Sequence, residues 1–261
     1  MREVRLGTLT LGRGPVKVAV PLVGSDRTAL RAELDALPDS ATDLVEWRID
    51  CLMPFPDTEM LLALARELKQ SLGSLPLLIT FRSLPEGGRL PLDAAAYREF
   101  QLRLAKEQLP DLLDVELFSG LPDPAAHIAA LQREHIPVIA SRHFFNGTPA
   151  PQVMQETFQR MQDCNADILK LAVMTETAED LLSLLQFSAD RRQTADRPFV
   201  LIGMGPHGVL SRISCAEFGS CLSFGALRES SAPGQLPARD LKRILSLLPE
   251  YPVSQTAEPR K

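Results

Sequence analysis

One lysine lies in a stretch of the chain where a charged side chain is costly to bury. Lys170 is the single polar residue of the run Ile168–Met174. An ammonium group in apolar surroundings tends to lose its proton, and a neutral amine can attack a ketone to form an imine. The alternative is an edge strand from which Lys170 reaches water along its aliphatic stem. The choice depends on whether this strand has an exposed edge.

A histidine follows the preceding apolar run. His143 lies two residues after the end of Pro137–Ser141 and is one of four histidines in the chain. Imidazole exchanges a proton near neutral pH, so His143 is a candidate general acid and base. An isolated histidine at the end of a strand is more often structural, but the parallel position of Lys170 on the adjacent strand reverses that preference. His127 and His135 lie in polar company, and we expect both at the surface.

Arginines and carboxylates recur at the ends of other apolar runs. Arg48, Arg82 and Arg212 each lie at or shortly after such an end, and Glu46 lies two residues before Arg48. Glu46 and Arg48 share one face of a strand, so a local ion pair is one explanation. Three arginines at neighbouring strand ends need more anions than the local sequence offers. A small anionic, polyhydroxylated ligand would supply them.

Eight short apolar runs alternate with stretches of helical periodicity, such as Asp26–Leu37 and Asp57–Leu72. This order predicts parallel strands with right-handed crossovers, and eight units predict an α/β fold, the (β/α)₈ TIM barrel. Active sites of such barrels lie at the carboxyl ends of the strands, and a closed barrel has no edge strand for Lys170. The runs are Val16–Val23, Leu44–Ile49, Leu77–Phe81, Leu112–Leu117, Pro137–Ser141, Ile168–Met174, Phe199–Met204 and Cys221–Leu227.

The two ends of the chain differ from this pattern. Val4–Gly14 alternates apolar and polar residues, and we predict an N-terminal β-hairpin that closes the bottom of the barrel. Residues 1–250 are expected to form a single catalytic barrel domain. Residues 251–261 are polar and contain proline, and we expect a flexible tail.

Composition excludes several classes of protein. The chain has 261 residues, 45% hydrophobic and 23% charged, with a formal net charge of −5, which is typical of a globular protein without nucleic-acid or membrane partners. We find no apolar stretch long enough for a signal peptide or a membrane span. The four cysteines lack metal-ligand spacing and indicate reduced thiols. We therefore expect a cytoplasmic protein.

Taken together, these motifs resemble type I 3-dehydroquinate dehydratase over nearly the whole chain. Each motif is short, and their shared order and spacing make the resemblance specific. The motifs are Glu46-Trp47-Arg48, Thr80-Phe81-Arg82 with Glu86-Gly87-Gly88, Ser141-Arg142-His143, Lys170, Met204 with Ser211-Arg212, and Ser231-Ala232-Pro233-Gly234-Gln235.

The resemblance implies a lyase of the shikimate pathway, in aromatic amino acid biosynthesis. It would dehydrate 3-dehydroquinate to 3-dehydroshikimate by syn elimination through a Schiff base on Lys170. His143 would be the general acid and base, oriented by Glu86. The family also implies a homodimer, no cofactor and no metal. In the substrate site, Arg212, Ser231 and Gln235 would hold the carboxylate, Glu46, Arg48 and Arg82 the ring hydroxyls, and Met204 and Phe145 would pack on the ring.

Two departures and two alternatives accompany this resemblance. Pro85 stands before Glu86 where relatives often carry lysine, and Pro21 stands where some carry serine. A class I Schiff-base aldolase would use the same lysine chemistry but often needs a phosphate site, for which Gly203–Gly208 is a weak candidate. A non-catalytic metabolite-binding sensor would be expected to have lost the lysine or the histidine.

Overall fold

Eight parallel strands form one sheet that curls into a nearly closed barrel in the computed structural model, which describes residues 2–91, 93–228 and 230–249. The sheet order is β10-β3-β4-β5-β6-β7-β8-β9. At the seam between β9 and β10, the Cys221 amide donates to the Phe199 carbonyl at 2.9 Å. Each of the eight predicted runs overlaps one of these strands, which confirms the barrel. The strands are β3 Lys17–Leu22, β4 Leu44–Arg48, β5 Leu77–Thr80, β6 Leu112–Glu116, β7 Val138–Phe144, β8 Ile168–Met174, β9 Phe199–Met204 and β10 Leu222–Phe224.

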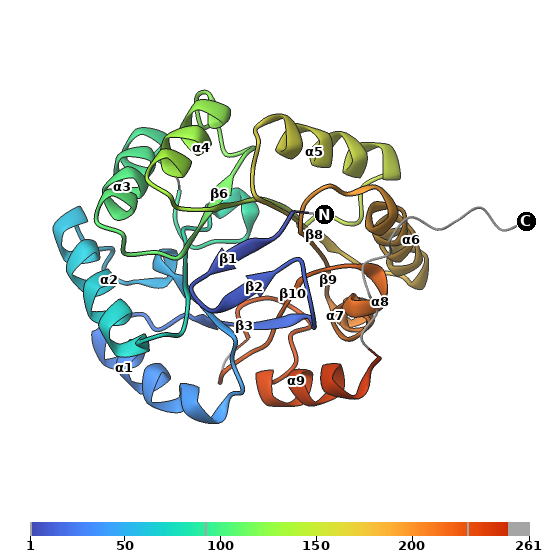
Figure 1. The fold of residues 1–261 in the computed structure, drawn as a ribbon, viewed down its shortest axis with the longest axis horizontal. Helices are drawn as coiled ribbons and strands as arrows, with labels where there is room; N and C mark the ends of the chain where they lie inside the picture. The colour runs from blue at the N-terminus through green and yellow to red at the C-terminus, as the bar shows by residue number, and fades with distance from the viewer. Residues whose placement is uncertain (1, 92, 229, 250–261) are drawn as a thin grey trace, which may run out of the picture.

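Helices follow the strands and surround the barrel (Figure 1). Aspartates begin four of them: the side chains of Asp26, Asp57, Asp93 and Asp123 each accept a hydrogen bond from the amide three residues on. Thr177 forms the predicted capping box at the start of α6. The helices are α1 Arg27–Ala36, α2 Thr58–Leu72, α3 Ala94–Lys106, α4 Pro124–Arg133, α5 Pro151–Asp163, α6 Ala178–Thr194, α7 Val209–Ile213, α8 Cys215–Phe218 and α9 Ala238–Leu247.

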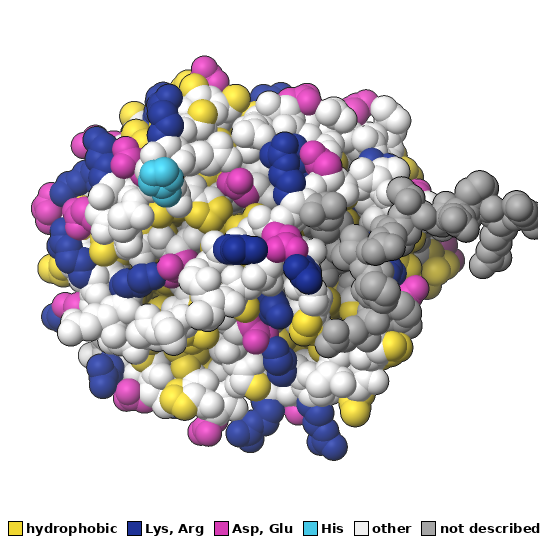
Figure 2. Space-filling view, viewed as in Figure 1, with side chains coloured by type: hydrophobic (Ala, Val, Ile, Leu, Met, Phe, Trp, Pro, Cys, Tyr) yellow, Lys and Arg dark blue, Asp and Glu magenta, His cyan; other side chains and the backbone are white. Residues whose placement is uncertain are grey.

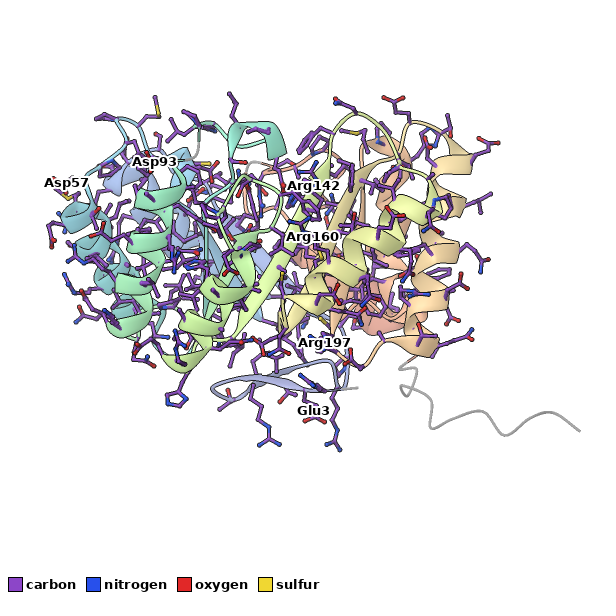
Figure 3. The ribbon with its side chains drawn as sticks, turned by 90° about the horizontal axis from the view of Figure 1, so that it is seen from above. Glu3, Asp57, Asp93, Arg142, Arg160 and Arg197 are labelled. Carbon is purple, nitrogen blue, oxygen red and sulfur yellow. The ribbon has the colours of Figure 1, made fainter. Side chains whose placement is uncertain are left out.

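The predicted hairpin is confirmed and covers the end of the barrel where the strands begin. Strands β1 (Val4–Leu6) and β2 (Leu9–Leu11) pair antiparallel. Val4, Leu6 and Leu11 are buried against the first inward-facing side chains of the barrel strands. Figure 3 shows the hairpin below the barrel, with Glu3 at its lower edge. In Figure 2, seen from the same side as Figure 1, atoms fill the centre of this end, with acidic and basic side chains interspersed.

The interior of the barrel changes from apolar to polar along the strands. Leu78, Leu112, Ile139 and Ile168 belong to the apolar cluster next to the hairpin. Two residues further along each strand, the inward side chains are polar, because successive inward positions in a strand are two residues apart. This second layer contains Thr80, Asp114, Ser141 and Lys170, all buried. The fold therefore gathers polar groups toward the carboxyl ends of the strands.

Two further expectations concern the C-terminal tail and membrane-spanning segments. The predicted flexible tail, residues 251–261, lies outside the described residues. In the part of the chain that the structure describes, each helix is too short or too polar to traverse a lipid bilayer.

Candidate active site

A cavity lies at the carboxyl ends of the strands. Its walls include all eleven side chains that the sequence singled out, so the fold brings every predicted site residue to one place. Those eleven are Glu46, Arg48, Arg82, Glu86, His143, Phe145, Lys170, Met204, Arg212, Ser231 and Gln235. The remaining lining residues are Gly87, Ala172, Ile202, Phe224 and Ala232.

Lys170 points into this cavity from the middle of β8 and is 5% exposed. Its Nζ lies 4.2 Å from the centroid of the Phe224 ring and 3.9 Å from Glu46 Oε1. Burial lowers the pKa of Lys170, with further lowering from Arg82 and Arg48, against the opposite effect of Glu46. The inward orientation rules out the exposed alternative for this lysine, and the depressed pKa favours the neutral, nucleophilic amine.

His143 lies on the next strand, β7. Ser141 pairs with Lys170 in the β7–β8 register, so His143 is two residues nearer the mouth of the cavity. Its Nδ1 lies 2.9 Å from Glu86 Oε2, and its backbone amide donates to the same oxygen at 3.1 Å. Burial lowers the pKa of His143 well below 6.5, and the charges of Arg82 and Lys170 lower it further. The neutral imidazole is therefore favoured, and it is able to accept a proton.

Glu86 reaches His143 from the loop after β5. It is 1% exposed and ends the short 3₁₀ helix Leu84–Glu86, where Gly87 adopts a left-handed conformation. Burial, followed by the nearby Glu116 carboxylate, raises the pKa of Glu86 to about 7. A Cβ on Gly87 would lie 2.1 Å from the Phe145 ring, so the loop requires glycine for close packing.

Arg82 is held by acidic residues of the neighbouring strand. Its Nη2 donates to Asp114 at 2.9 Å, and its Nη1 donates to Glu116 at 2.8 Å and to Ser141 at 2.9 Å. These bonds join the segment after β5 to β6 and β7 at the cavity wall. Sequence reasoning missed Asp114 and Glu116, although acidic residues at alternate positions of an apolar strand give the same signal as Lys170.

Arg48 has a carboxylate partner of its own. Its Nε and Nη2 both donate to Asp50 at 2.8 Å in a bidentate pair. Glu46 instead accepts from the Thr80 hydroxyl at 2.9 Å. The expected shortage of anions is therefore wrong for Arg48 and Arg82, because Asp50, Asp114 and Glu116 supply them within the fold.

Arg212 is the exception among the three arginines. It lies on α7 with 1% exposure, and its Nη2 donates to the Pro233 carbonyl at 3.1 Å. Its Nε has no hydrogen-bond partner, and no carboxylate among the described residues pairs with it. Burial lowers the pKa of Arg212 to about 10. A buried cation without an anion at a cavity wall is suited to bind an anionic ligand.

The loop that contacts Arg212 also carries Ser231 and Gln235. The Ser231 amide donates to Gln235 Oε1 at 2.8 Å, and Gln235 Nε2 donates to Ser231 Oγ at 2.9 Å. The loop is seated on the turn after β9, where the Gly205 amide donates to the Pro233 carbonyl at 3.3 Å. Both side chains therefore face the cavity already paired with each other.

Two further expectations are settled by packing. Gly203 and Gly208, considered as a phosphate loop, pack on each other: a Cβ on Gly208 would lie 2.3 Å from the Gly203 carbonyl carbon. The Gly203 amide is already bonded to Ser211 Oγ at 2.8 Å. His127, expected at the surface, is fully buried, and its Nε2 lies 2.8 Å from Gln101 Oε1. That prediction was wrong because a polar partner on α3 lies opposite α4.

The four cysteines are not among the residues that line this cavity. All four cysteines are free, and Cys51, Cys164 and Cys215 are buried. Within residues 2–91, 93–228 and 230–249, no group of three or more His, Cys, Asp or Glu side chains is placed to hold a metal ion.

Comparison with known proteins connects this geometry to one family. The family model described as type I 3-dehydroquinase matches residues 18–252. A 3-dehydroquinate dehydratase of Salmonella typhimurium is 34% identical over 249 residues, covering 95% of this chain and 99% of the relative. One of Listeria monocytogenes is 36% identical over 248 residues, covering 95% and 98%.

A solved structure agrees with these relatives in fold. The type I 3-dehydroquinate dehydratase of Clostridium difficile superposes with a TM-score of 0.90 at 34% identity, covering 94% of this chain and 97% of the other. The likeness therefore spans the strands and loops that build the cavity.

Proposed function

Since the chain belongs to the type I 3-dehydroquinase family and is an enzyme of the 3-dehydroquinate dehydratase class, we propose that it forms an imine between Lys170 and the ketone of 3-dehydroquinate. The observation that carries this proposal is the buried amine of Lys170, whose pKa is lowered at the wall of the cavity. A neutral amine adds to the ketone carbon, and loss of one water leaves a protonated imine.

The imine supplies the electron sink that elimination needs. Its positive charge receives the electron pair released when a proton leaves the carbon beside it. His143 takes that proton with its free nitrogen, and the hydroxyl on the next carbon departs. The imidazolium returns the proton to this hydroxyl, which leaves as water. Because one side chain serves both steps, both groups leave from the same face of the ring, which is syn elimination. Hydrolysis then releases 3-dehydroshikimate and restores Lys170.

Arg212 is the proposed partner of the substrate carboxylate. Its guanidinium is buried and lacks a carboxylate partner among the described residues, and Ser231 and Gln235 lie on the adjoining loop. Glu46, Arg48 and Arg82 are the proposed partners of the ring hydroxyls. Both terminal nitrogens of Arg82 already donate to side chains of the barrel, namely Asp114, Glu116 and Ser141. We therefore propose that Arg82 mainly holds the site in shape and contributes less to hydroxyl binding than Arg48. Met204 and Phe145 supply apolar walls.

The resemblance supports three further proposals about the enzyme's setting. We place the reaction in the shikimate pathway, in aromatic amino acid biosynthesis, because its proposed product is 3-dehydroshikimate. We also propose a homodimer and a cytoplasmic location. Size-exclusion chromatography with light scattering tests the dimer, and fractionation of the source cells tests the location.

Borohydride trapping tests the covalent mechanism. Reduction in the presence of 3-dehydroquinate should leave a substrate-derived mass on the peptide containing Lys170. Lys170→Ala should show neither adduct nor turnover. His143→Ala should still form the adduct while losing turnover, so that the adduct accumulates. An adduct on another residue, or normal turnover by either variant, would overturn the assignments. An aldolase would instead require a phosphorylated substrate, and a sensor would bind without producing the ultraviolet-absorbing enone.

A further inference from the structure

We propose that Arg142 is a positioning residue, which binds the far oxygen of Glu86 and so determines which nitrogen of His143 carries the proton. Arg142 is not one of the residues lining the cavity, and it reaches the reaction through two other side chains. The inference rests on the proposed role of His143 as the base.

The two oxygens of Glu86 are divided between two neighbours on β7. Arg142 Nη1 donates to Glu86 Oε1 at 2.9 Å, while His143 Nδ1 lies 2.9 Å from Oε2. Among the described residues, Arg142 is the one arginine or lysine that donates a hydrogen bond to Glu86. Arg82 Nη1 is 3.6 Å from Oε2 but bonds to Glu116 and Ser141 instead.

Aromatic rings hold the guanidinium of Arg142 in place. It lies over the Phe118 ring at 5.2 Å from the centroid and over the Phe144 ring at 5.0 Å. Arg160, on α5, lies over Phe118 at 5.2 Å. Figure 3 labels Arg142 and Arg160 one above the other on this flank of the barrel. Stacking leaves the N–H donors in the guanidinium plane available, so Arg142 is oriented without losing its bond to Glu86.

The charges around Glu86 show why one cation matters. Burial and Glu116 on β6 favour its protonated form, whereas Arg82, just after β5, and Arg142 on β7 favour the carboxylate. On the His143 side lie Lys170 of β8 and Arg48 of β4, while Glu46 and Asp114 face Lys170. The balance puts the pKa of Glu86 at about 7 with Arg142 in place. Removing Arg142 would move that pKa upward, so Glu86 would be protonated at neutral pH.

The protonation state of Glu86 decides the tautomer of His143. An ionised carboxylate can only accept hydrogen bonds, so Nδ1 must donate and Nε2 keeps its lone pair. Nε2 has no hydrogen-bond partner among the described side chains and is the nitrogen left to act as the base. A protonated Glu86 can instead donate to Nδ1, which leaves the proton on Nε2 and no base.

Three variants test this role through the pH dependence of kcat/KM. In Arg142→Gln we expect the acidic limb to move upward by about one pH unit or more, with activity about tenfold lower near pH 6 and restored toward wild type near pH 9. Arg142→Lys keeps a positive charge and should recover part of the shift. Arg160→Gln removes a cation from the same aromatic stack without touching Glu86, and it should keep the wild-type profile.

Some outcomes would overturn the proposal. The first is a pH profile of kcat/KM for Arg142→Gln that superimposes on the wild-type profile. The second is a profile for Arg142→Gln in which kcat/KM is lowered equally at every pH, as a merely structural role predicts. A shift of the acidic limb in Arg160→Gln equal to that in Arg142→Gln would also overturn the proposal, because it would assign the effect to the aromatic stack. Borohydride trapping on the same proteins separates this from the covalent mechanism. An adduct on Lys170 with an unchanged profile contradicts only the role of Arg142, whereas no adduct in the wild type contradicts the proposed function.

Discussion

Among the side chains of the cavity, Arg212 differs from Arg48 and Arg82 in how its charge is balanced. Asp50 pairs with Arg48, and Asp114 pairs with Arg82, within the fold. Among the described residues, the one hydrogen-bond partner of the Arg212 side chain is the Pro233 carbonyl, and burial lowers the pKa of Arg212. Removing one member of a buried ion pair is strongly unfavourable, so binding an anion beside an unpaired buried cation is favourable by the same electrostatics.

The prediction at this scale concerns substrate affinity. Arg212→Met should raise KM for 3-dehydroquinate by about 10- to 100-fold, the range expected for loss of a charge-assisted hydrogen bond, with a smaller change in kcat. Arg212→Lys should lie between Arg212→Met and wild type. Steady-state kinetics measures this, and thermal unfolding checks that each variant is folded. An unchanged KM in Arg212→Met would contradict the proposal that Arg212 binds the substrate carboxylate.

At the scale of elements, the contact between β9 and the turn before α7 places Arg212. Gly208 touches Gly203 so closely that a Cβ on Gly208 would lie 2.3 Å from the Gly203 carbonyl. Gly208 has φ of −70°, which any residue adopts, so the requirement for glycine is steric. Ser211 secures the turn, because its hydroxyl donates to the Gly208 carbonyl at 2.6 Å and accepts from the Gly203 amide.

Gly208→Ala should therefore push α7 away from β9. We expect about 1–3 kcal/mol lower free energy of unfolding, the usual effect of overpacking, together with a raised KM as Arg212 moves. His207→Ala is the matched control, because His207 is exposed and adjacent in sequence. Urea unfolding and steady-state kinetics measure both effects. If the two variants behaved alike, the close contact would not be what positions Arg212.

At the scale of the whole molecule, a second buried histidine makes stability depend on pH. His127 on α4 contacts Gln101 of α3, whose Nε2 donates to the Asp114 carbonyl on β6 at 2.8 Å. Burial lowers the pKa of His127 from its ordinary 6.5 to about 4. Below pH 6.5 the unfolded chain binds a proton that the folded chain does not. The loss of stability that His127 causes is therefore absent above pH 6.5 and grows until about pH 4.

The corresponding prediction compares wild type with His127→Gln. Between pH 7 and pH 5 the wild type should lose about 2 kcal/mol more in free energy of unfolding, because only it carries the imidazole. His143 titrates in both proteins, so its contribution cancels. Urea unfolding at the two pH values gives the comparison. Equal losses would mean that His127 does not couple protonation to folding.

The order of the elements followed from the sequence alone, and the sequence with its family resemblance also predicted residues that line the cavity. Apolar runs such as Ile168–Met174 and Phe199–Met204 became β8 and β9 with the predicted bounds. Strand formation depends on local alternation and side-chain type, and both can be read from neighbouring residues. Lys170 was recognisable because a single charge interrupts such a run, and barrel geometry then places strand ends together.

The partners of those residues were decided only by the tertiary structure. Arg82 meets Asp114 across 32 positions of the chain, and Arg142 meets Glu86 across 56. His127 is buried because Gln101 lies opposite it, 26 positions away. Such contacts depend on strand register and on how each helix packs against its neighbours, which no local pattern encodes. The charge balance around Glu86 and Arg212 is therefore a property of the closed barrel.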